Sequence, residues 1–480
     1  MLFNSFQFLL FLPIVFAAYW SLNCHLRLQN FFVILASYVF YGWWDWRFLI
    51  LIAFTSAWSY TIGLLELRRW NLKPSKVLLA ASLVVNLGIL ATFKYFNFFA
   101  EQFATVLRGI GLEASLPSIS IILPVGISFY TFQALSYTID VYRRQVKPTK
   151  DPFAFFAFIS FFPQLVAGPI ERATNLLPQF LKARNFDYAN AVLGCRQMLW
   201  GLFKKMVVAD NCAAVANSLL NNPSQTNGLA IWLGVFMFTI QIYGDFSGYS
   251  DIAIGCSRLF GINLMRNFAF PYFSRDIAEF WRRWHISLTT WFRDYLYIPL
   301  GGSRCGRAKK VRNTFVIFLV SGLWHGANWT FIAWGTFHAL LFLPLLLRNR
   351  NRRNMDIVAA DRKIPSLVEL KEMLATFLLA LLGWTLFRAR NMGECLAWFG
   401  HMLNPFSWGV SADEDVSGTA VRALIATAIM FAVEWVSRKD SQGLMTCPGN
   451  KALRWLCYLA VVFLIAMYTP GAQEFIYFQF

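Results

Sequence analysis

The chain is divided into long apolar blocks that contain no Asp, Glu, Lys or Arg. The blocks cover residues 1–26, 28–44, 77–93, 211–244, 313–347 and 455–473. A helix that crosses a membrane needs roughly 20 predominantly apolar residues, and the blocks meet or approach that length. Only 14% of the 480 residues are charged, whereas a soluble domain carries about a quarter. The sequence therefore predicts an all-α polytopic membrane protein, with roughly eleven transmembrane helices in one domain over residues 1–480.

The net charge of +18 is concentrated in short basic clusters between the apolar blocks. The clusters are Arg68–Lys76, Arg143–Lys150, Arg304–Arg312 and Arg348–Arg353. Such clusters mark cytoplasmic loops and can rest on the anionic headgroups of the lipid bilayer. Because the intervening loops near Asp45 and Glu101 are poorer in positive charge, we expect the N-terminus on the outer side of the membrane. No aromatic-interleaved basic face accompanies the charge, so nucleic acid is not an expected partner.

Proline and glycine interrupt three largely apolar stretches in the central part of the chain. The interruptions are Pro124 with Gly126, then Pro163 with Gly168 and Pro169, then Gly244 with Gly248. The last pair also places Asp245 and Asp251 in apolar surroundings. Each interruption alone is explained equally well by a helix kink or by a cavity wall, since irregular backbone at membrane depth must be satisfied by protein or water. Together they favour a hollow core with re-entrant segments.

Residues 275–298 are too charged to span a membrane, yet they are rich in Trp, Phe, Tyr and Leu. Their charged and apolar side chains alternate at helical spacing. The pattern predicts an interfacial helix that lies at the membrane surface or is wedged under the bundle. His285 lies in this segment beside Arg282 and Arg283, and position alone favours a solvated or interfacial histidine.

His325 is the histidine with the fewest charges around it, because residues 313–347 contain none. Desolvation there favours the neutral imidazole, which is the form that a general base requires. Gly322 and Gly326 leave room for a ligand or for another backbone. On a continuous helix, Asn328 and Trp329 would lie on the same face and could orient the ring. A packing histidine with its N–H bonded to a carbonyl explains the position equally well.

The other histidines are weaker candidates for chemistry. His338 lies about 220° around a continuous helix from His325, so the two rings would point to nearly opposite sides and form a poor metal pair. We therefore interpret His338 mainly as a packing residue, and His25 and His401 as interfacial. The eight cysteines show no zinc-like spacing, and no metal site is predicted. The loop Leu300–Arg304 either holds a phosphate-bearing donor or is a simple basic turn.

Six stretches together resemble the membrane-bound O-acyltransferase family, in the branch of alginate and peptidoglycan O-acetyltransferases and the teichoic acid D-alanyl transferase. The stretches are LPVGISFYTFQALSYTIDVYR at 123–143, FFPQLVAGPIER at 161–172, DFSGYSDIAIG at 245–255, FWRRWHISLTTWFRDYLYIPLGG at 280–302, SGLWHGANWTFIAWG at 321–335 and FIYFQF at 475–480. They occur in the family order and extend over essentially the whole chain.

The resemblance implies a ring of tilted helices around a central funnel. It assigns the reacting centre to His325 and, against the expectation from position alone, a second catalytic role to His285. It also implies that the segment around His285 lines a donor tunnel. The tunnel residues assigned in this way are Arg282, Trp284, Arg293, Asp294 and Asn328.

By the same resemblance, the chain is an O-acyltransferase of the bacterial inner membrane. It would take acetyl groups from cytoplasmic acetyl-CoA or another acyl thioester, with no tightly bound cofactor. The acetyl would pass outward to a cell-surface polysaccharide such as alginate or peptidoglycan, with a periplasmic acetyltransferase or esterase-like partner. Two rival functions remain open: a transporter that moves an acyl donor without catalysing transfer, and a scaffold subunit of a polysaccharide export complex. Broken helices with intramembrane carboxylates favour the transporter. The lack of repeated halves in the sequence argues against it.

Overall fold

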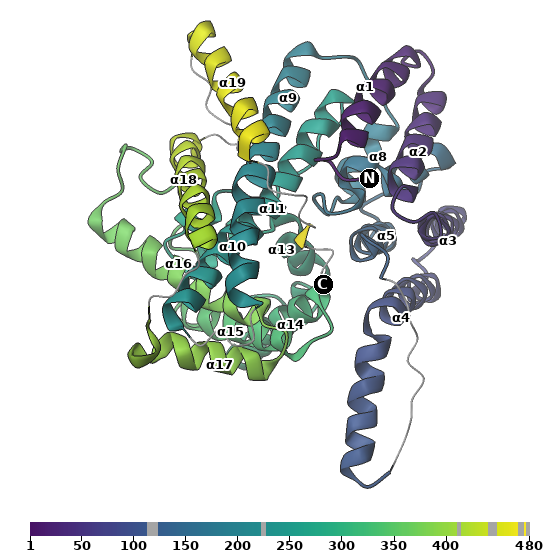
Figure 1. Cartoon of the computed structure of the whole chain (residues 1–480). Helices are drawn as coiled ribbons and strands as arrows, with labels where there is room; N and C mark the ends of the chain where they lie inside the picture. Colours follow the sequence, from purple (N-terminus) through teal and green to yellow (C-terminus); the bar gives the residue numbers. More distant parts are fainter. Residues whose placement is uncertain (113–122, 222–226, 410–413, 440–448, 469–474, 477–480) are drawn as a thin grey trace. The chain divides into compact units, whose positions relative to one another are not determined.

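The computed structural model describes residues 1–112, 123–221, 227–409, 414–439, 449–468 and 475–476. Within these ranges the secondary structure is helical and includes no β-strand (Figure 1), which confirms the predicted all-α class. Cys447 and the last four residues of the C-terminal motif, 477–480, lie outside the described residues.

The helices group into two compact units that alternate along the chain. The first unit contains Met1–Ala191, Ser257–Leu264 and Gly326–Asn328, and the second contains Val192–Cys256, Met265–His325 and Trp329–Phe480. Each unit therefore combines segments that are distant in the sequence and are brought together by helix packing. The prediction of a single domain stays a prediction.

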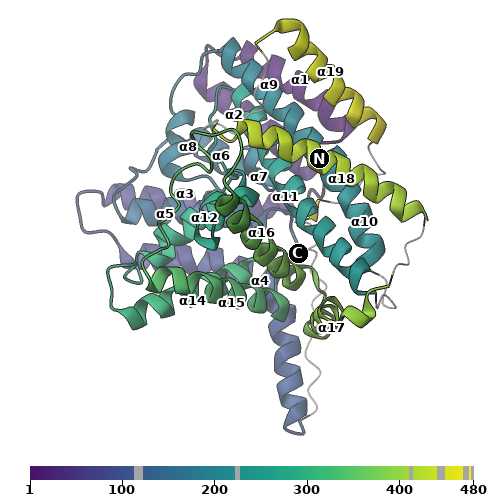
Figure 2. The same cartoon turned by 90° about the vertical axis from the view of Figure 1, so that its left-hand side faces the viewer.

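In the first unit, α2 packs against α6 and α7, while α3 and α4 pack against α5 (Figures 1 and 2). Its helices are α1 (Phe6–Ser21), α2 (Leu26–Gly42), α3 (Phe48–Arg68), α4 (Lys76–Gly109), α5 (Ile127–Tyr142), α6 (Pro152–Ser160), α7 (Phe162–Leu165) and α8 (Ala173–Phe180). Asp151 begins α6: its carboxylate accepts hydrogen bonds from the backbone N–H groups of Phe153 and Ala154, just after Pro152, an arrangement that suits the first turn of a helix.

In the second unit, α14 and α15 form a tight helical hairpin, and α16 packs on α15. The helices are α9 (Tyr188–Leu202), which starts in the first unit, η1 (Phe203–Ala209), α10 (Asp210–Leu220), α11 (Gly228–Leu259), η2 (Pro271–Phe273), α12 (Ile277–Arg283), α13 (Ile286–Phe292), η3 (Arg293–Tyr297), α14 (Arg307–His325), α15 (Trp329–Leu347), α16 (Leu367–Arg388), α17 (Met392–Leu403), η4 (Pro405–Ser407), α18 (Glu414–Ser437) and α19 (Lys451–Tyr468). η1 and η3 are π-helical turns, and π-turns are frequent at functional sites.

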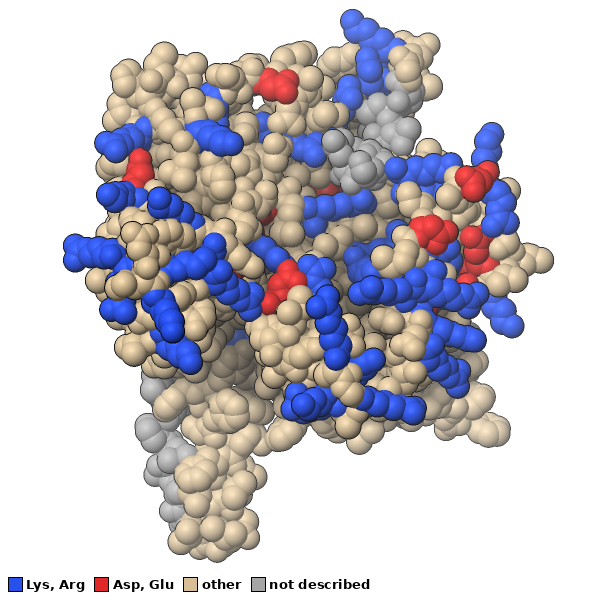
Figure 3. Space-filling view, turned by 180° about the vertical axis from the view of Figure 1, so that it is seen from behind, with Lys and Arg blue, Asp and Glu red and all other residues tan. Residues whose placement is uncertain are grey.

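Seven helices among the described residues are long and apolar enough to cross a membrane: α3, α4, α11, α15, α16, α18 over Ser417–Ser437, and α19. The shorter α1 is also apolar. The predicted total of about eleven is not confirmed, because some blocks form short helices and α14 begins with a basic turn at Arg307. Lys and Arg side chains cluster on the surface and outnumber Asp and Glu there (Figure 3). The chain is a multi-pass membrane protein.

Two of the three predicted helix interruptions are present and one is wrong. α5 begins only after Gly126, whose φ of +76° requires glycine, and α6 and α7 are short pieces around Pro163. By contrast, α11 runs unbroken through Gly244 and Gly248. The reason is helix packing: a Cβ at Gly248 would lie 2.7 Å from the carbonyl oxygen of Gly201, so glycine lets α11 approach α9 closely.

The α14–α15 hairpin depends on a similar close approach at Gly335. A Cβ there would collide with the carbonyl oxygen of Phe318 on α14. We expect Gly335→Ala to destabilise the fold by about 1–3 kcal/mol, because the clash is with backbone and not with a movable side chain. Gly88→Ala on α4 is the matched control, since a Cβ there meets nothing within 4 Å. Thermal unfolding of the two detergent-solubilised variants tests this, and equal midpoints would contradict it.

Candidate active site

His285 lies at a sharp turn between two short helices. α12 ends at Arg283 and α13 begins at Ile286, while His285 itself has a left-handed φ of +43°. Its side chain is only 1% exposed. The segment therefore forms two short helices in place of the one helix predicted, and the expectation of a solvated histidine is wrong. Aromatic residues of this segment, such as Phe280 and Trp284, are buried, and the imidazole lies against rings of other elements.

The His285 ring is enclosed by polar and aromatic neighbours. Its Nδ1 lies 3.1 Å from Oδ1 of Asn267, and its centroid lies 4.6 Å from the ring of Phe246 and 5.9 Å from that of Trp324. Burial lowers the pKa of His285 to about 3, because a cation loses its hydration there. The imidazole is therefore neutral at physiological pH.

His325 is the last residue of α14 and is 5% exposed. Its ring centroid lies 5.2 Å from that of Trp334 and 5.1 Å from that of Phe387. Because α14 ends at His325, the prediction that Asn328 and Trp329 share its helical face is wrong. Gly322 allows α14 and α15 to pack closely, because a Cβ there would collide with the carbonyl oxygen of Phe331 on α15.

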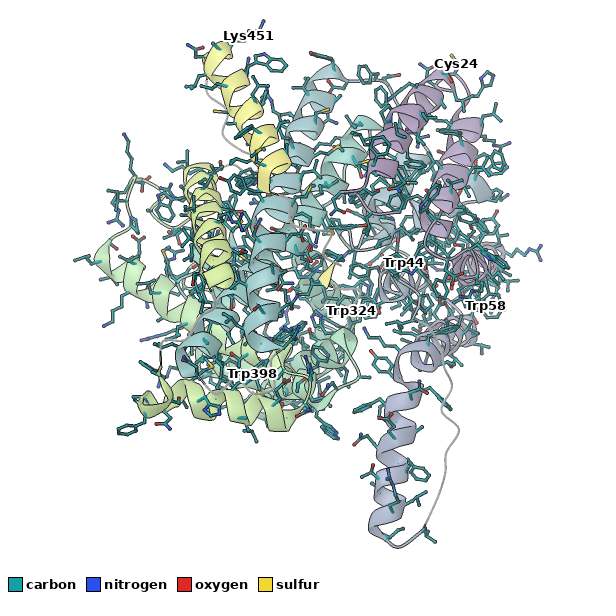
Figure 4. The ribbon with its side chains drawn as sticks, in the orientation of Figure 1. Cys24, Trp44, Trp58, Trp324, Trp398 and Lys451 are labelled. Carbon is teal, nitrogen blue, oxygen red and sulfur yellow. The ribbon has the colours of Figure 1, made fainter. Side chains whose placement is uncertain are left out.

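Trp324 brings the two candidate catalytic histidines into one neighbourhood. Its ring centroid lies 4.9 Å from that of His325 and 5.9 Å from that of His285. Trp324 is labelled in Figure 4, among the side chains of the second unit. The two histidines are 40 positions apart in the sequence, so only tertiary packing, through the contact of His285 with Trp324 near the end of α14, can juxtapose them.

His338 is fully buried on α15, and its ring centroid lies 5.0 Å from those of both Trp281 and Trp334. The predicted angle of about 220° between His325 and His338 assumed one continuous helix. That helix does not exist, because α14 and α15 are the two separate arms of a hairpin. Trp334 consequently contacts both His325 and His338. The interpretation of His338 as a packing residue stays a prediction.

A cavity of about 790 Å³ opens beside these residues in the second unit. Its apolar wall includes Trp281, Phe318 and Leu346. Its basic residues are Arg282, Arg293, Lys310 and Arg352. Ser321 also lines the cavity, and it precedes His325 by about one helical turn on α14. The cavity is therefore lined by both apolar and basic side chains, and one of its lining residues lies about one helical turn from His325.

The predicted tunnel residues are only partly brought together here. Arg293 lines the cavity, with its Nε 2.6 Å from a carboxylate oxygen of Asp294. Trp284 does not line the cavity; it is 1% exposed, and its ring centroid lies 4.8 Å from that of Trp384. Asn328 lies in the connection between α14 and α15 and is not among the lining residues. The binding roles of all five residues stay predictions.

Arg282 lines the cavity, and its guanidinium also holds the loop between α15 and α16. Its two terminal nitrogens donate to the carbonyl oxygens of Asn351 and Asn354, both at 2.6 Å. The same loop is held by Arg275, which donates to the carboxylate of Asp356 at 2.9 Å. Arg282 therefore shapes the cavity wall, and sequence reasoning alone did not show this.

Asn267 is the other residue that sequence reasoning missed. It is fully buried and contacts His285, yet it precedes that residue by 18 positions in an irregular segment. The loop Leu300–Arg304 forms a turn with positive φ at Gly301 and Gly302, and Ser303 lines the cavity. Whether that turn holds phosphate stays a prediction.

Comparison with known proteins shows the family to which the chain belongs. A family model described as MBOAT, membrane-bound O-acyltransferase family, matches residues 143–377, a span that contains both His285 and His325. The probable alginate O-acetylase AlgI of Pseudomonas putida is 36% identical over 501 residues, which cover 100% of each chain.

Two further relatives carry related names. The peptidoglycan O-acetyltransferase of Helicobacter pylori is 33% identical over 82% of this chain and 78% of its own. The teichoic acid D-alanyltransferase of Streptococcus thermophilus is 31% identical over 52% of this chain and 62% of its own. The chain is therefore an O-acyltransferase and belongs to the membrane-bound O-acyltransferase family.

Proposed function

We propose that this protein transfers acetyl groups from a cytoplasmic thioester, acetyl-CoA, across the bacterial inner membrane for O-acetylation of a cell-surface polysaccharide. Alginate and peptidoglycan are the acceptor classes, because relatives that match most of the chain carry the names alginate O-acetylase and peptidoglycan O-acetyltransferase. The N-terminus would face the periplasm, where a partner acetyltransferase would receive the acetyl group.

The cavity of the second unit is the observation that carries this proposal. Acetyl-CoA combines a phosphate-bearing nucleotide with a long, less polar arm that ends in the thioester. The basic residues Arg293, Lys310 and Arg352 suit the phosphates, and the wall formed by Trp281 and Phe318 suits the arm. Arg282, whose N–H groups hold the neighbouring loop, would shape this site more than bind the donor.

The reaction needs a base that is neutral before it acts. His325 accepts the proton of an acceptor hydroxyl as the oxygen attacks the thioester carbonyl carbon. The carbon–sulfur bond then breaks, and the proton passes from the imidazolium to the leaving thiolate, so the products are an O-acetyl ester and a thiol. General base catalysis of this kind contributes about a hundred- to ten-thousand-fold to the rate. His285, buried, neutral and also in contact with Trp324, would assist on the donor side.

Acetyl-CoA labelled in its acetyl group tests the donor directly. The purified protein in liposomes should release free thiol from this compound and pass label to an added polysaccharide or partner protein. The His325→Ala protein should release none above background. A wild-type preparation that binds acetyl-CoA but never cleaves the thioester would contradict the enzymatic role and favour a transporter.

Deletion of the gene separates the enzyme from an export scaffold. The enzyme proposal expects surface polymer in normal amount but without acetyl esters, whereas a scaffold predicts less polymer. Mass analysis of the cell-wall and secreted polysaccharides measures both quantities and identifies the acceptor. Cleavage of an N-terminal tag by a protease confined to the cytoplasmic side would contradict the proposed orientation.

His285→Ala should reduce O-acetylation strongly but not completely, because His325 remains. Since burial lowers the pKa of His285 to about 3, its neutral form is present above that pH and would be lost only as pH falls towards it. The wild-type rate should therefore show no acidic limb from His285 between about pH 5 and 8. Rates with labelled acetyl-CoA across this range provide the measurement, and a wild-type rate in His285→Ala would leave this residue with a structural role.

A further inference from the structure

We propose that Asn267 is a positioning residue that holds the proton of His285 on Nδ1 and so keeps Nε2 as the basic nitrogen. The tautomer itself follows from the contacts of the described residues. Its consequence for the reaction rests on the proposed function of His285.

The Asn267 side chain presents oxygen, and not nitrogen, to this turn. Its Oδ1 lies 3.3 Å from the backbone nitrogen of Ser287 and 2.9 Å from the Ser287 hydroxyl. A backbone N–H can only donate, so the amide atom facing it must be the accepting oxygen. The Nδ2 group on the other side donates to the hydroxyl of Ser250 at 3.1 Å. Both ends of the amide are therefore oriented by partners other than the histidine.

His285 must then be the donor in its contact with Asn267. Its Nδ1 lies 3.1 Å from Oδ1, and two acceptors facing each other without a hydrogen would repel. The Ser287 hydroxyl is 3.4 Å from the same Nδ1, and it already donates its hydrogen to Oδ1, so it also presents a lone pair to Nδ1. Because a neutral imidazole carries one hydrogen, Nδ1–H leaves the lone pair on Nε2.

The backbone of Asn267 holds the same turn in place. Its carbonyl oxygen accepts from the nitrogen of Ile286 at 2.8 Å, and the nitrogen of Ala269 donates to the carbonyl oxygen of Arg283 at 2.9 Å. The segment therefore clamps the turn on both sides of His285, whose positive φ is costly for a residue with a Cβ. One residue thus sets both the place of the ring and its tautomer.

Charged groups reach Asn267 from several elements, and they bear on any pH test. Lys204 of η1, Asp251 of α11 and Arg266 line a small polar pocket together with Asn267. Lys204 and Asp251 are paired at 2.5 Å. Against the ring itself lie Phe246 of α11, Phe268, and Trp324 of α14.

Nitrogen NMR of the full-length protein labelled with 15N-histidine tests the tautomer without relying on activity. The chain has five histidines, so a His285→Gln sample identifies the His285 signals by their loss. We expect a protonated Nδ1 and an unprotonated Nε2 in lipid bilayers at neutral pH. The reverse pattern in the wild type would overturn the proposal.

Matched variants separate positioning from folding. Asn267→Ala should move His285 towards a mixture of tautomers and lower the kcat for acetyl transfer at least tenfold, with a smaller change in KM. Ser250→Ala removes the partner of Nδ2 but not the oxygen that faces His285, so it should leave the wild-type tautomer. Asn267→Ala that folds and retains both the wild-type spectrum and the wild-type kcat would refute the positioning role.

Asn267→Asp supplies a pH profile of activity that would stay unchanged if Asn267 had only a structural role. The carboxylate retains the acceptor for Nδ1–H but stabilises the imidazolium, so it should raise the pKa of His285. The neutral base would then be lost at a higher pH, and activity should fall on the acidic side where the wild type is flat. If His285→Ala proves fully active, the proposed function of His285 is wrong. The tautomer is tested separately, because the NMR spectrum does not depend on activity.

Discussion

His325→Ala is expected to abolish acyl transfer while the protein still accumulates in the membrane. The imidazole lies at the end of α14 against Trp324, Trp334 and Phe387, and it is the general base of the proposed reaction. Loss of the base should lower the rate by about a hundred- to ten-thousand-fold. The measurement is the O-acetyl content of the surface polymer, together with thiol release by the purified variant.

Two further variants make this result interpretable. His325→Gln keeps a polar side chain of similar size in the aromatic surroundings, and it should also be inactive if the base is what matters. His25→Ala is the matched control, because His25 is an exposed residue ahead of α2 with no side-chain capping bond, and it should retain wild-type activity. Normal acetyl content in His325→Ala would remove this residue from the mechanism.

Lys205→Met is expected to cause the largest loss of stability. The Lys205 amine lies 2.7 Å from a carboxylate oxygen of Asp210 and 2.9 Å from one of Asp245, and all three side chains are buried. Asp245 also accepts a hydrogen bond from the backbone nitrogen of Ile476 at 2.8 Å. The three charged side chains therefore connect η1, α10, α11 and the C-terminal segment. Removing the cation would leave two buried carboxylates facing each other, at a cost of about 3–5 kcal/mol.

Thermal unfolding in detergent measures this loss, together with the amount of folded protein recovered. Arg27→Met serves as the control, because the Arg27 side chain is 79% exposed in its pair with Asp151, and exposed pairs contribute little. A double variant, Lys205→Met with Asp245→Asn, should recover part of the stability, since it removes one of the stranded charges. Equal unfolding midpoints for Lys205→Met and Arg27→Met would show that the buried network does not stabilise the fold.

The amino-acid sequence alone determined the class of structure and pointed to His325 as the candidate for the reacting centre. Long blocks without charge can be buried only in a bilayer or a very apolar core, so the all-helical membrane fold followed from hydropathy. His325 was found because its 35-residue block contains no charge, which is a local property. The motif order around His285 and His325 identified the family, and the family model and the relatives confirmed it.

The tertiary structure alone decided how these residues meet. Glycine breaks a helix in isolation but permits close packing beside another helix, so the unbroken course of α11 past Gly248 depended on its neighbour α9. The mixed polarity of residues 275–298 indicated an interface, whereas the aromatic side chains packed inward and buried His285 at a positive φ. Its partner Asn267 lies in an irregular segment without periodicity, where no local pattern predicts a contact. Local rules report what a segment prefers, and the site depends on which segments finally pack together.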